Sequence, residues 1–129
     1  MIVLITGSNG LLGQKILSRL RDLDVKVIAT SKGVNRNKED GSYMYESLDI
    51  TNKNEINRVL NLYKPNVVFN TAAMTNVDLC EEERFLCDSL NVDAVSYLAD
   101  SCLAIDAHLI HISTDFIFDG TKGAVYKED

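Results

Sequence analysis

The chain has little of what marks several classes of protein. Its 129 residues include no tryptophan, one proline and three cysteines. An odd cysteine count in a chain of this size predicts free thiols in a reducing cytoplasm rather than a disulfide scaffold. The two histidines, His108 and His111, would point to opposite faces of a strand. We therefore expect no metal site.

Long apolar runs and excess positive charge are also missing. No apolar run approaches the length of a membrane span. Met1 leads directly into an apolar segment, without the pattern of a signal or transit peptide. The net charge of −6 argues against general nucleic-acid binding, which needs a basic surface. These absences predict a cytoplasmic protein that binds neither membranes nor nucleic acid.

Apolar segments of strand length alternate with segments of helical periodicity. The expected strands are residues 2–6, 25–29, 45–48, 67–70 and 109–113. Helices are expected at 11–21, from a cap at Thr51 through an apolar stripe ending at Tyr63, and within 81–104. This alternation predicts an α/β fold, a doubly wound parallel sheet with strand order 3-2-1-4-5.

The helical region within 81–104 supplies several candidates for the core. They are four leucines: Leu86, Leu90, Leu98 and Leu103. Cys80 lies just before this region, and Cys87 lies within it. The two cysteines are seven positions apart and would share one helix face. We interpret them as small buried side chains.

The first strand runs directly into a glycine turn with the sequence Gly-Ser-Asn-Gly-Leu-Leu-Gly at residues 7–13. Glycine lets the backbone turn tightly and leaves no Cβ between a peptide and a ligand. The first turn of a helix attracts phosphate, because its N–H groups are unpaired and carry partial positive charge. Gly7, Gly10 and Gly13 therefore predict binding of a dinucleotide pyrophosphate. The alternative is a tight strand-to-helix turn without a ligand.

Other polar residues are predicted to share one edge of the sheet with this turn. They follow the carboxyl ends of the remaining strands, at 30–36, Asp49, 70–74 and 113–115. Ligands bind doubly wound sheets at that edge. The common position strengthens the prediction of a binding site.

The end of the second strand bears on which cofactor is bound. An acidic residue there would hold the ribose hydroxyls of NAD, but the chain has Thr30, Ser31 and Lys32, with Arg36 and Lys38 nearby. Hydroxyls and cations suit the additional phosphate of NADP, so NADP is favoured over NAD. The alternative is that these cations only solvate a loop. Asp49 could accept a hydrogen bond from the adenine amino group or could cap the following helix.

Four segments resemble motifs of extended short-chain dehydrogenase/reductases. They are residues 6–13, 70–78, 91–94 and 113–120, and the last resembles the dTDP-4-dehydrorhamnose reductases most specifically. The resemblance spans the whole chain and implies a Rossmann-like fold. It also implies that residues 1–129 are an NAD(P)-binding domain, with a substrate domain beyond Asp129.

The resemblance implies a role for individual residues in cofactor binding. Leu11 and Leu12 would join the glycines around the pyrophosphate, and Asp49 and Ile50 would flank adenine. Ala72 and Ala73 would leave room for ribose. Asn91 would anchor a water or tie helix to strand. The remaining residues that the resemblance places at the cofactor are Asn9, Asn70 and Ser113.

The resemblance also bears on catalysis. Thr114 matches a hydroxyl that hydrogen-bonds the sugar ketone, and Asp115 lies beside it. Members of the family use a tyrosine as proton donor, with a lysine four positions later that favours the phenolate. None of the five tyrosines in the sequence has that lysine. We therefore expect the catalytic pair beyond Asp129, and this chain by itself to be inactive.

Three functions follow as hypotheses. The first is the NADP-binding portion of a dTDP-4-dehydrorhamnose reductase, which would reduce a nucleotide-linked 4-keto sugar in dTDP-L-rhamnose biosynthesis. The second is a non-catalytic NADP-binding module that regulates a partner. The third is an epimerase or dehydratase of nucleotide sugars that uses NAD. A sheet face or edge left open after the fifth strand would also favour self-association.

Overall fold

A computed structural model of the chain describes residues 1–37, 42–114, 118–123 and 125–127. Its centre is a parallel sheet in the order β3-β2-β1-β4-β5. The strands are β1 (Ile2–Thr6), β2 (Lys26–Ser31), β3 (Met44–Ser47), β4 (Val67–Asn70) and β5 (His108–His111). The predicted fold class and strand order are confirmed.

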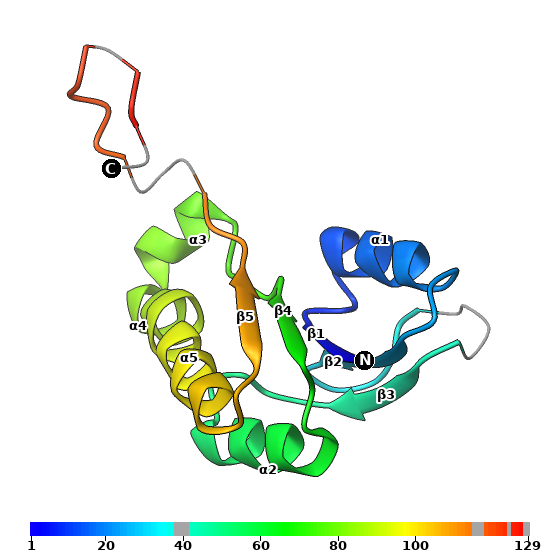
Figure 1. The fold of residues 1–129 in the computed structure, drawn as a ribbon. Helices are drawn as coiled ribbons and strands as arrows, with labels where there is room; N and C mark the ends of the chain where they lie inside the picture. The colour runs from blue at the N-terminus through cyan, green and yellow to red at the C-terminus, as the bar shows by residue number, and fades with distance from the viewer. Residues whose placement is uncertain (38–41, 115–117, 124, 128–129) are drawn as a thin grey trace.

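Helices cover both faces of this sheet (Figure 1). The helical elements are α1 (Leu11–Leu20), α2 (Lys53–Tyr63), α3 (Val77–Glu82), α4 (Arg84–Asp88), a π-helical turn (Ser89–Asp93) and α5 (Ala94–Ala104). α1 packs on one face, while α2 and α5 pack on the other. The sheet is therefore doubly wound, as the alternation of strands and helices predicts.

Two layers of buried side chains hold the helices to the sheet. Leu4, Ile28 and Val68 face α2 and α5, whereas the neighbouring Val3 and Ile5 face α1. Successive side chains of a strand point to opposite faces, so a strand covered on both sides must be apolar throughout. This explains why residues 2–5 of β1 are all apolar.

The helical region within 81–104 is not one continuous helix. Glu83 leaves the helical conformation between α3 and α4, with φ −113° and ψ 52°. Cys80 and Cys87 consequently lie on separate helices, and both are only partly buried. The prediction of one shared helix was wrong, because helical periodicity does not continue through this break, but the two thiols still lie in contact.

The core candidates from that region divide in the same way. Leu98 is fully buried and Leu90 is partly buried, but Leu86 is 46% exposed and Leu103 is 83% exposed. The buried face of α5 is formed by Ala94, Leu98 and Cys102, at intervals of four residues. Leu103 falls outside that stripe, so its prediction as a core residue was wrong.

Several boundaries differ from the sequence prediction, and two of these differences lie at the edge that carries the site. The N-cap of α2 is Asn52 rather than Thr51, and its side-chain oxygen accepts hydrogen bonds from the N–H groups of Asn54 and Glu55. β5 ends at His111, so Ile112 and Ser113 lie beyond the sheet. The loop at this edge is therefore longer than expected.

The glycine turn packs directly against the end of β4. Gly7 has φ +66°, and a Cβ built on it would lie 2.7 Å from the backbone nitrogen of Ala72. A Cβ on Gly13 would lie 2.5 Å from the carbonyl oxygen of Gly7. Real Cβ atoms do not approach backbone so closely, so both positions require glycine. The turn and the start of α1 are thereby fixed beside β4.

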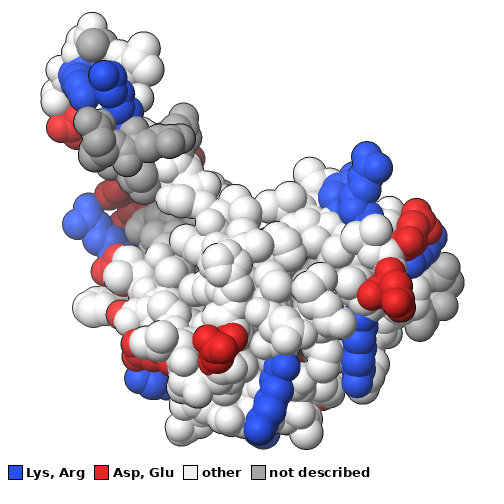
Figure 2. Space-filling model, viewed as in Figure 1, with Lys and Arg blue, Asp and Glu red and all other residues white. Residues whose placement is uncertain are grey.

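Part of the surface carries few charges. In Figure 2 the area over β4 and β5 is almost free of charged residues, which gather around its margin. Ile110 of β5 is half-buried. In the part of the chain that the structure describes, no helix is long and apolar enough to span a membrane.

The packing of the glycine turn predicts the effect of two matched substitutions. Gly7 and Gly33 both have positive φ, but a Cβ on Gly33 would meet no atom within 4 Å. Gly7→Ala should therefore lower the free energy of unfolding by about 2 kcal/mol more than Gly33→Ala does, because only Gly7→Ala adds an overpacking penalty. Urea denaturation measures the difference, and equal losses would contradict the packing argument.

A second pair of substitutions tests the core of α5. Leu98→Ala should lower the free energy of unfolding by about 2–5 kcal/mol, because it opens a cavity between α5 and the sheet. Leu103→Ala on the same helix should change it by no more than about 0.5 kcal/mol, since that side chain is exposed. Urea denaturation of both variants provides the measurement. A comparable loss in Leu103→Ala would show that α5 is seated differently.

Candidate functional site

Two adjacent cavities open at the carboxyl ends of the strands. The smaller has a volume of about 470 Å³ and the larger about 740 Å³. Both are within the usual size range of small-molecule sites. Gly10, Thr71 and Ala73 line both cavities, so the two meet beside the glycine turn. Together they form one continuous site along the edge that the sequence predicts.

The smaller cavity lies between the glycine turn, the segment after β2 and the segment after β3. It brings together these residues that were predicted to bind the cofactor: Gly7, Asn9, Gly10, Ser31, Lys32, Arg36, Asp49, Ile50, Ala72 and Ala73. It also has apolar walls that the sequence analysis did not identify, Leu48, Leu86 and Leu90. Their apolar character pointed only to the core.

The larger cavity lies between the start of α1, the segment after β4 and the segment after β5. The predicted residues that it brings together are Gly10, Leu11, Leu12, Gly13, Ala73, Asn91, Ser113 and Thr114. Leu11 is 79% exposed, although it is a large apolar residue at the start of a helix. Its position at the cavity explains why it lies outside the core. His111 and Cys80 also line this cavity and were not predicted there.

The N-terminus of α1 lies where the two cavities meet. Gly10 is its N-cap, with extended backbone and no side-chain capping bond, and its first turn contains no acidic residue. The N–H groups at a helix start have no partner within the helix and carry partial positive charge. A phosphate is well suited to such a position.

Two of the predicted residues serve the framework and line neither cavity. Thr30 is fully buried, and its hydroxyl donates to the carbonyl oxygen of Ile5 at 3.0 Å. The Asn70 side chain accepts from the Thr6 hydroxyl and from the N–H of Ala72, and its Nδ2 lies 3.0 Å from Nδ1 of His111. Asn70 thus joins the ends of β1, β4 and β5 beneath the site.

Asp49 forms an ion pair at the mouth of the smaller cavity. Its carboxylate lies 2.6 Å from Nζ of Lys32 and accepts from both the N–H and the hydroxyl of Thr51. Partial burial raises the pKa of Asp49, but these hydrogen bonds outweigh that effect and hold the pKa below its usual value. The hydrogen bond to Asp49, with its charge, raises the pKa of Lys32. Both groups are therefore charged at neutral pH.

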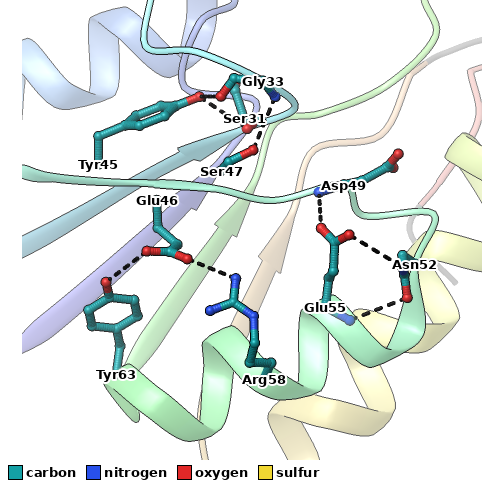
Figure 3. A network of polar contacts seen from close by, with 10 residues as sticks. All are labelled: Ser31, Gly33, Tyr45, Glu46, Ser47, Asp49, Asn52, Glu55, Arg58 and Tyr63. Carbon is teal, nitrogen blue, oxygen red and sulfur yellow. Dashed lines mark hydrogen bonds and ion pairs between the residues drawn. The ribbon is translucent and has the colours of Figure 1, made fainter.

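The segment that carries Asp49 is held from α2 (Figure 3). The N–H of Asp49 donates to Oε2 of Glu55 at 3.0 Å, and the other oxygen of Glu55 accepts from Nδ2 of Asn52 at 3.3 Å. Asn52 occupies the N-cap, so Asp49 does not cap the helix. Its carboxylate is left to face the cavity and Lys32.

The segment after β2 is held from β3, as Figure 3 also shows. The Tyr45 hydroxyl donates to the carbonyl oxygens of Gly33 at 2.7 Å and Ser31 at 3.1 Å. Ser47 accepts from the N–H of Gly33 at 3.2 Å. Burial raises the pKa of Tyr45, which keeps its hydroxyl protonated as a donor. Ser31, Lys32 and Arg36 are thus presented to the cavity on a braced loop.

Asn91 clamps the segment after β4. Its Oδ1 accepts from the N–H of Met74 and its Nδ2 donates to the carbonyl oxygen of the same residue, both at 2.9 Å. Asn91 lies in the π-helical turn Ser89–Asp93, a local widening that often occurs at functional sites. Two roles were expected for Asn91, anchoring a water or tying helix to strand. In the structure its side chain ties the π-helical turn to the segment after β4.

The residues expected to take part in catalysis follow β5. Ser113 and Thr114 are exposed and line the larger cavity. Asp115 and Lys38 lie outside the described residues. Among the described residues, no group of three or more His, Cys, Asp or Glu side chains is arranged to hold a metal ion.

Known proteins match the chain over its full length. The model of the family described as RmlD substrate binding domain matches residues 1–129. A dTDP-4-dehydrorhamnose reductase from Aggregatibacter actinomycetemcomitans is 37% identical over 98% of this chain and 39% of its own length. Methionine adenosyltransferase 2 subunit beta from Bos taurus is 32% identical over 98% of this chain and 36% of its own length.

The fold of the chain is also similar to that of solved structures. A dTDP-4-dehydrorhamnose reductase from Clostridium acetobutylicum superposes with a TM-score of 0.82 at 36% identity, over 99% of this chain and 41% of its own. A UDP-glucose 4-epimerase from Thermotoga maritima has a TM-score of 0.79 over 88% of this chain and 38% of its own, but at 21% identity it shows the shared fold alone.

The chain spans about two fifths of the length of the relatives it matches. Within that span, the order of strands, the glycine turn and the cavities beside it agree with a Rossmann-like fold. The family match extends over every residue of the sequence. The chain therefore belongs to the RmlD substrate-binding-domain family.

Proposed function

We propose that this chain is the NADP-binding portion of a dTDP-4-dehydrorhamnose reductase. The observation that carries the proposal is the pair of cavities that meet at the uncapped start of α1. A dinucleotide consists of two nucleosides joined by a pyrophosphate, so it matches two chambers joined at an anion site. The missing Cβ atoms at Gly7 and Gly13 let the turn lie close to β4. In the described part of the chain, no side chain caps the N–H groups in the first turn of α1.

Each cavity has a proposed occupant. The smaller cavity would hold the adenosine half, with adenine beside Asp49 and Ile50. The larger cavity would hold the nicotinamide half, with Leu11 and Leu12 at the start of α1 beside it. When bound, the cofactor supplies a hydride to a carbonyl carbon. The protein's part in this portion is to bind both nucleosides and to set their separation.

Preference for NADP over NAD rests on the braced loop after β2. Ser31, Lys32 and Arg36 all line the smaller cavity, where the ribose of the adenosine half would lie. Arginine and a hydroxyl together suit a phosphate monoester. Lys32 is already paired with Asp49, so Arg36 is the residue we expect to contribute most to phosphate binding.

The substrate is proposed to be a nucleotide-linked 4-keto sugar that enters from the larger cavity. Thr114 lines this cavity from the segment after β5. We propose that its hydroxyl donates a hydrogen bond to the sugar ketone, and that Asp115 acts beside it. That bond would polarise the carbonyl and orient its carbon toward the incoming hydride.

A second candidate is a regulatory module that binds NADP without catalysis. Its support is the similarity to subunit beta of methionine adenosyltransferase 2 at 32% identity over the same stretch. The residues of the two cavities serve cofactor binding equally in both functions. The two candidates therefore differ in whether the protein reduces a sugar.

The cofactor preference predicts the effect of removing Arg36. Arg36→Ala should weaken NADPH binding by about tenfold, or 1.4 kcal/mol, because a charge-assisted hydrogen bond to the phosphate is lost. NADH binding should change little. Lys32→Ala should also weaken NADPH more than NADH, because it leaves the Asp49 carboxylate unpaired beside the phosphate. Isothermal titration calorimetry with both cofactors measures these losses.

Lys53→Ala is the matched control for those cation substitutions. Lys53 pairs with Asp100 at 3.2 Å and lines neither cavity. Its removal should leave both affinities unchanged. Equal losses of NADPH and NADH affinity in Arg36→Ala would refute the phosphate assignment. Flat titrations of the wild type with both cofactors would refute the proposed function itself.

The missing tyrosine and lysine pair predicts the behaviour of this 129-residue chain in a turnover assay. It should bind NADPH and yet oxidise it negligibly with dTDP-4-dehydro-6-deoxy-L-mannose, because general acid catalysis typically contributes about 10²- to 10⁴-fold. Steady-state absorbance at the NADPH band provides the readout. Rapid turnover by this chain would contradict the expected position of the catalytic pair.

A further inference from the structure

Asn9 connects the glycine turn to the loop after β2. Its Nδ2 donates to the carbonyl oxygen of Val34 at 3.0 Å, and its Oδ1 accepts from the N–H of Arg36 at 2.9 Å. Its own N–H donates to Oγ of Ser31 at 3.1 Å. One residue of the turn therefore contacts the last residue of β2 and two residues of the loop that follows it.

Asn9 is itself held in place. Its carbonyl oxygen accepts from Nε2 of Gln14 on α1 at 2.9 Å. Its neighbours Ser8 and Gly10 are fixed in turn, since the N–H of Ser8 donates to the carbonyl oxygen of Thr30 and the N–H of Gly10 to that of Gly7. The side-chain amide consequently projects from a rigid base. The Asn9 amide can therefore fix the conformation of the loop after β2.

The two ends of the loop are held differently. Tyr45 and Ser47 hold Ser31 and Gly33 from β3. At Val34 and Arg36, the Asn9 amide supplies the hydrogen bonds to the body of the protein among the residues that the structure describes. The backbone position of Arg36 therefore depends on Asn9.

We propose that Asn9 is a positioning residue that sets the preference for NADPH by fixing Arg36 at the smaller cavity. The proposal rests on the proposed function, in which Arg36 binds the additional phosphate of NADP. The proposal links the two places where the cofactor's phosphates would bind. Asn9 belongs to the glycine turn, where the pyrophosphate would lie, and it orders the loop after β2, where the additional phosphate of NADP would lie. Asn9 acts on the phosphate through Arg36.

The Asn9 amide orders the loop before the cofactor binds. Without the Asn9 side-chain amide, the backbone groups of Val34 and Arg36 hydrogen-bond to water instead. The Arg36 side chain then samples more conformations. Binding NADPH must then order this segment, and that entropy reduces affinity. NADH lacks the additional phosphate of NADPH, so its binding does not depend on Arg36. The loss should therefore fall on NADPH selectively.

Calorimetry on the protein with NADPH and NADH tests the proposal. Asn9→Ala and Asn9→Ser should each weaken NADPH by about five- to tenfold, the size of one or two lost hydrogen bonds, and NADH by less than about twofold. In the Asn9→Ala, Arg36→Ala double variant, the NADPH loss should not exceed that of Arg36→Ala alone, because Asn9 acts through Arg36. Thermal unfolding of each variant confirms that it is folded.

Asn35→Ala is the control within the same loop. Its side chain contacts the Tyr43 hydroxyl and the N–H of Asn37, and it lines neither cavity. It should leave both affinities unchanged. Equal losses for NADPH and NADH in Asn9→Ala, or additive losses in the double variant, would overturn the positioning role. A wild-type protein without preference for NADPH would instead refute the proposed function.

Discussion

The fit of the glycine turn against the end of β4 is the constraint on which the site depends. Gly7 lies so close to the backbone of Ala72 that a methyl group has no room, and Gly13 is equally close to Gly7. This contact brings the start of α1 to the point where the two cavities meet. Without it, the helix would pack further away and its N–H groups would face solvent instead of a shared site.

Polar side chains around the site hold the segments that form it. Asn70, Asn91 and Glu55 hold the segments that follow β4 and β3. Each of them hydrogen-bonds a backbone N–H in one of these segments, which fixes loops that a ligand would otherwise have to order. The residues that line the cavities include glycines, apolar side chains and the charged Lys32, Arg36 and Asp49. This arrangement leaves the site open and preformed.

Much of this arrangement could be predicted from the sequence. Periodicity and the glycine spacing predicted the sheet, its strand order and the edge that carries the site, because these follow from local patterns and simple packing rules. The break at Glu83 and the exposure of Leu103 could not be predicted, since helical periodicity alone does not reveal where a helix stops or which stripe packs. The contacts of Asn9 with Val34 and Arg36 join segments far apart in sequence, and no local signal marks them.

The central claim is that a pyrophosphate binds at the start of α1. Titration of ¹⁵N-labelled protein with NADPH, followed by amide chemical shifts, tests it most directly. We expect the largest shifts at the N–H groups of Leu11, Leu12 and Gly13, with smaller shifts extending into both cavities. Saturating NADPH that leaves these three resonances unmoved would contradict the account.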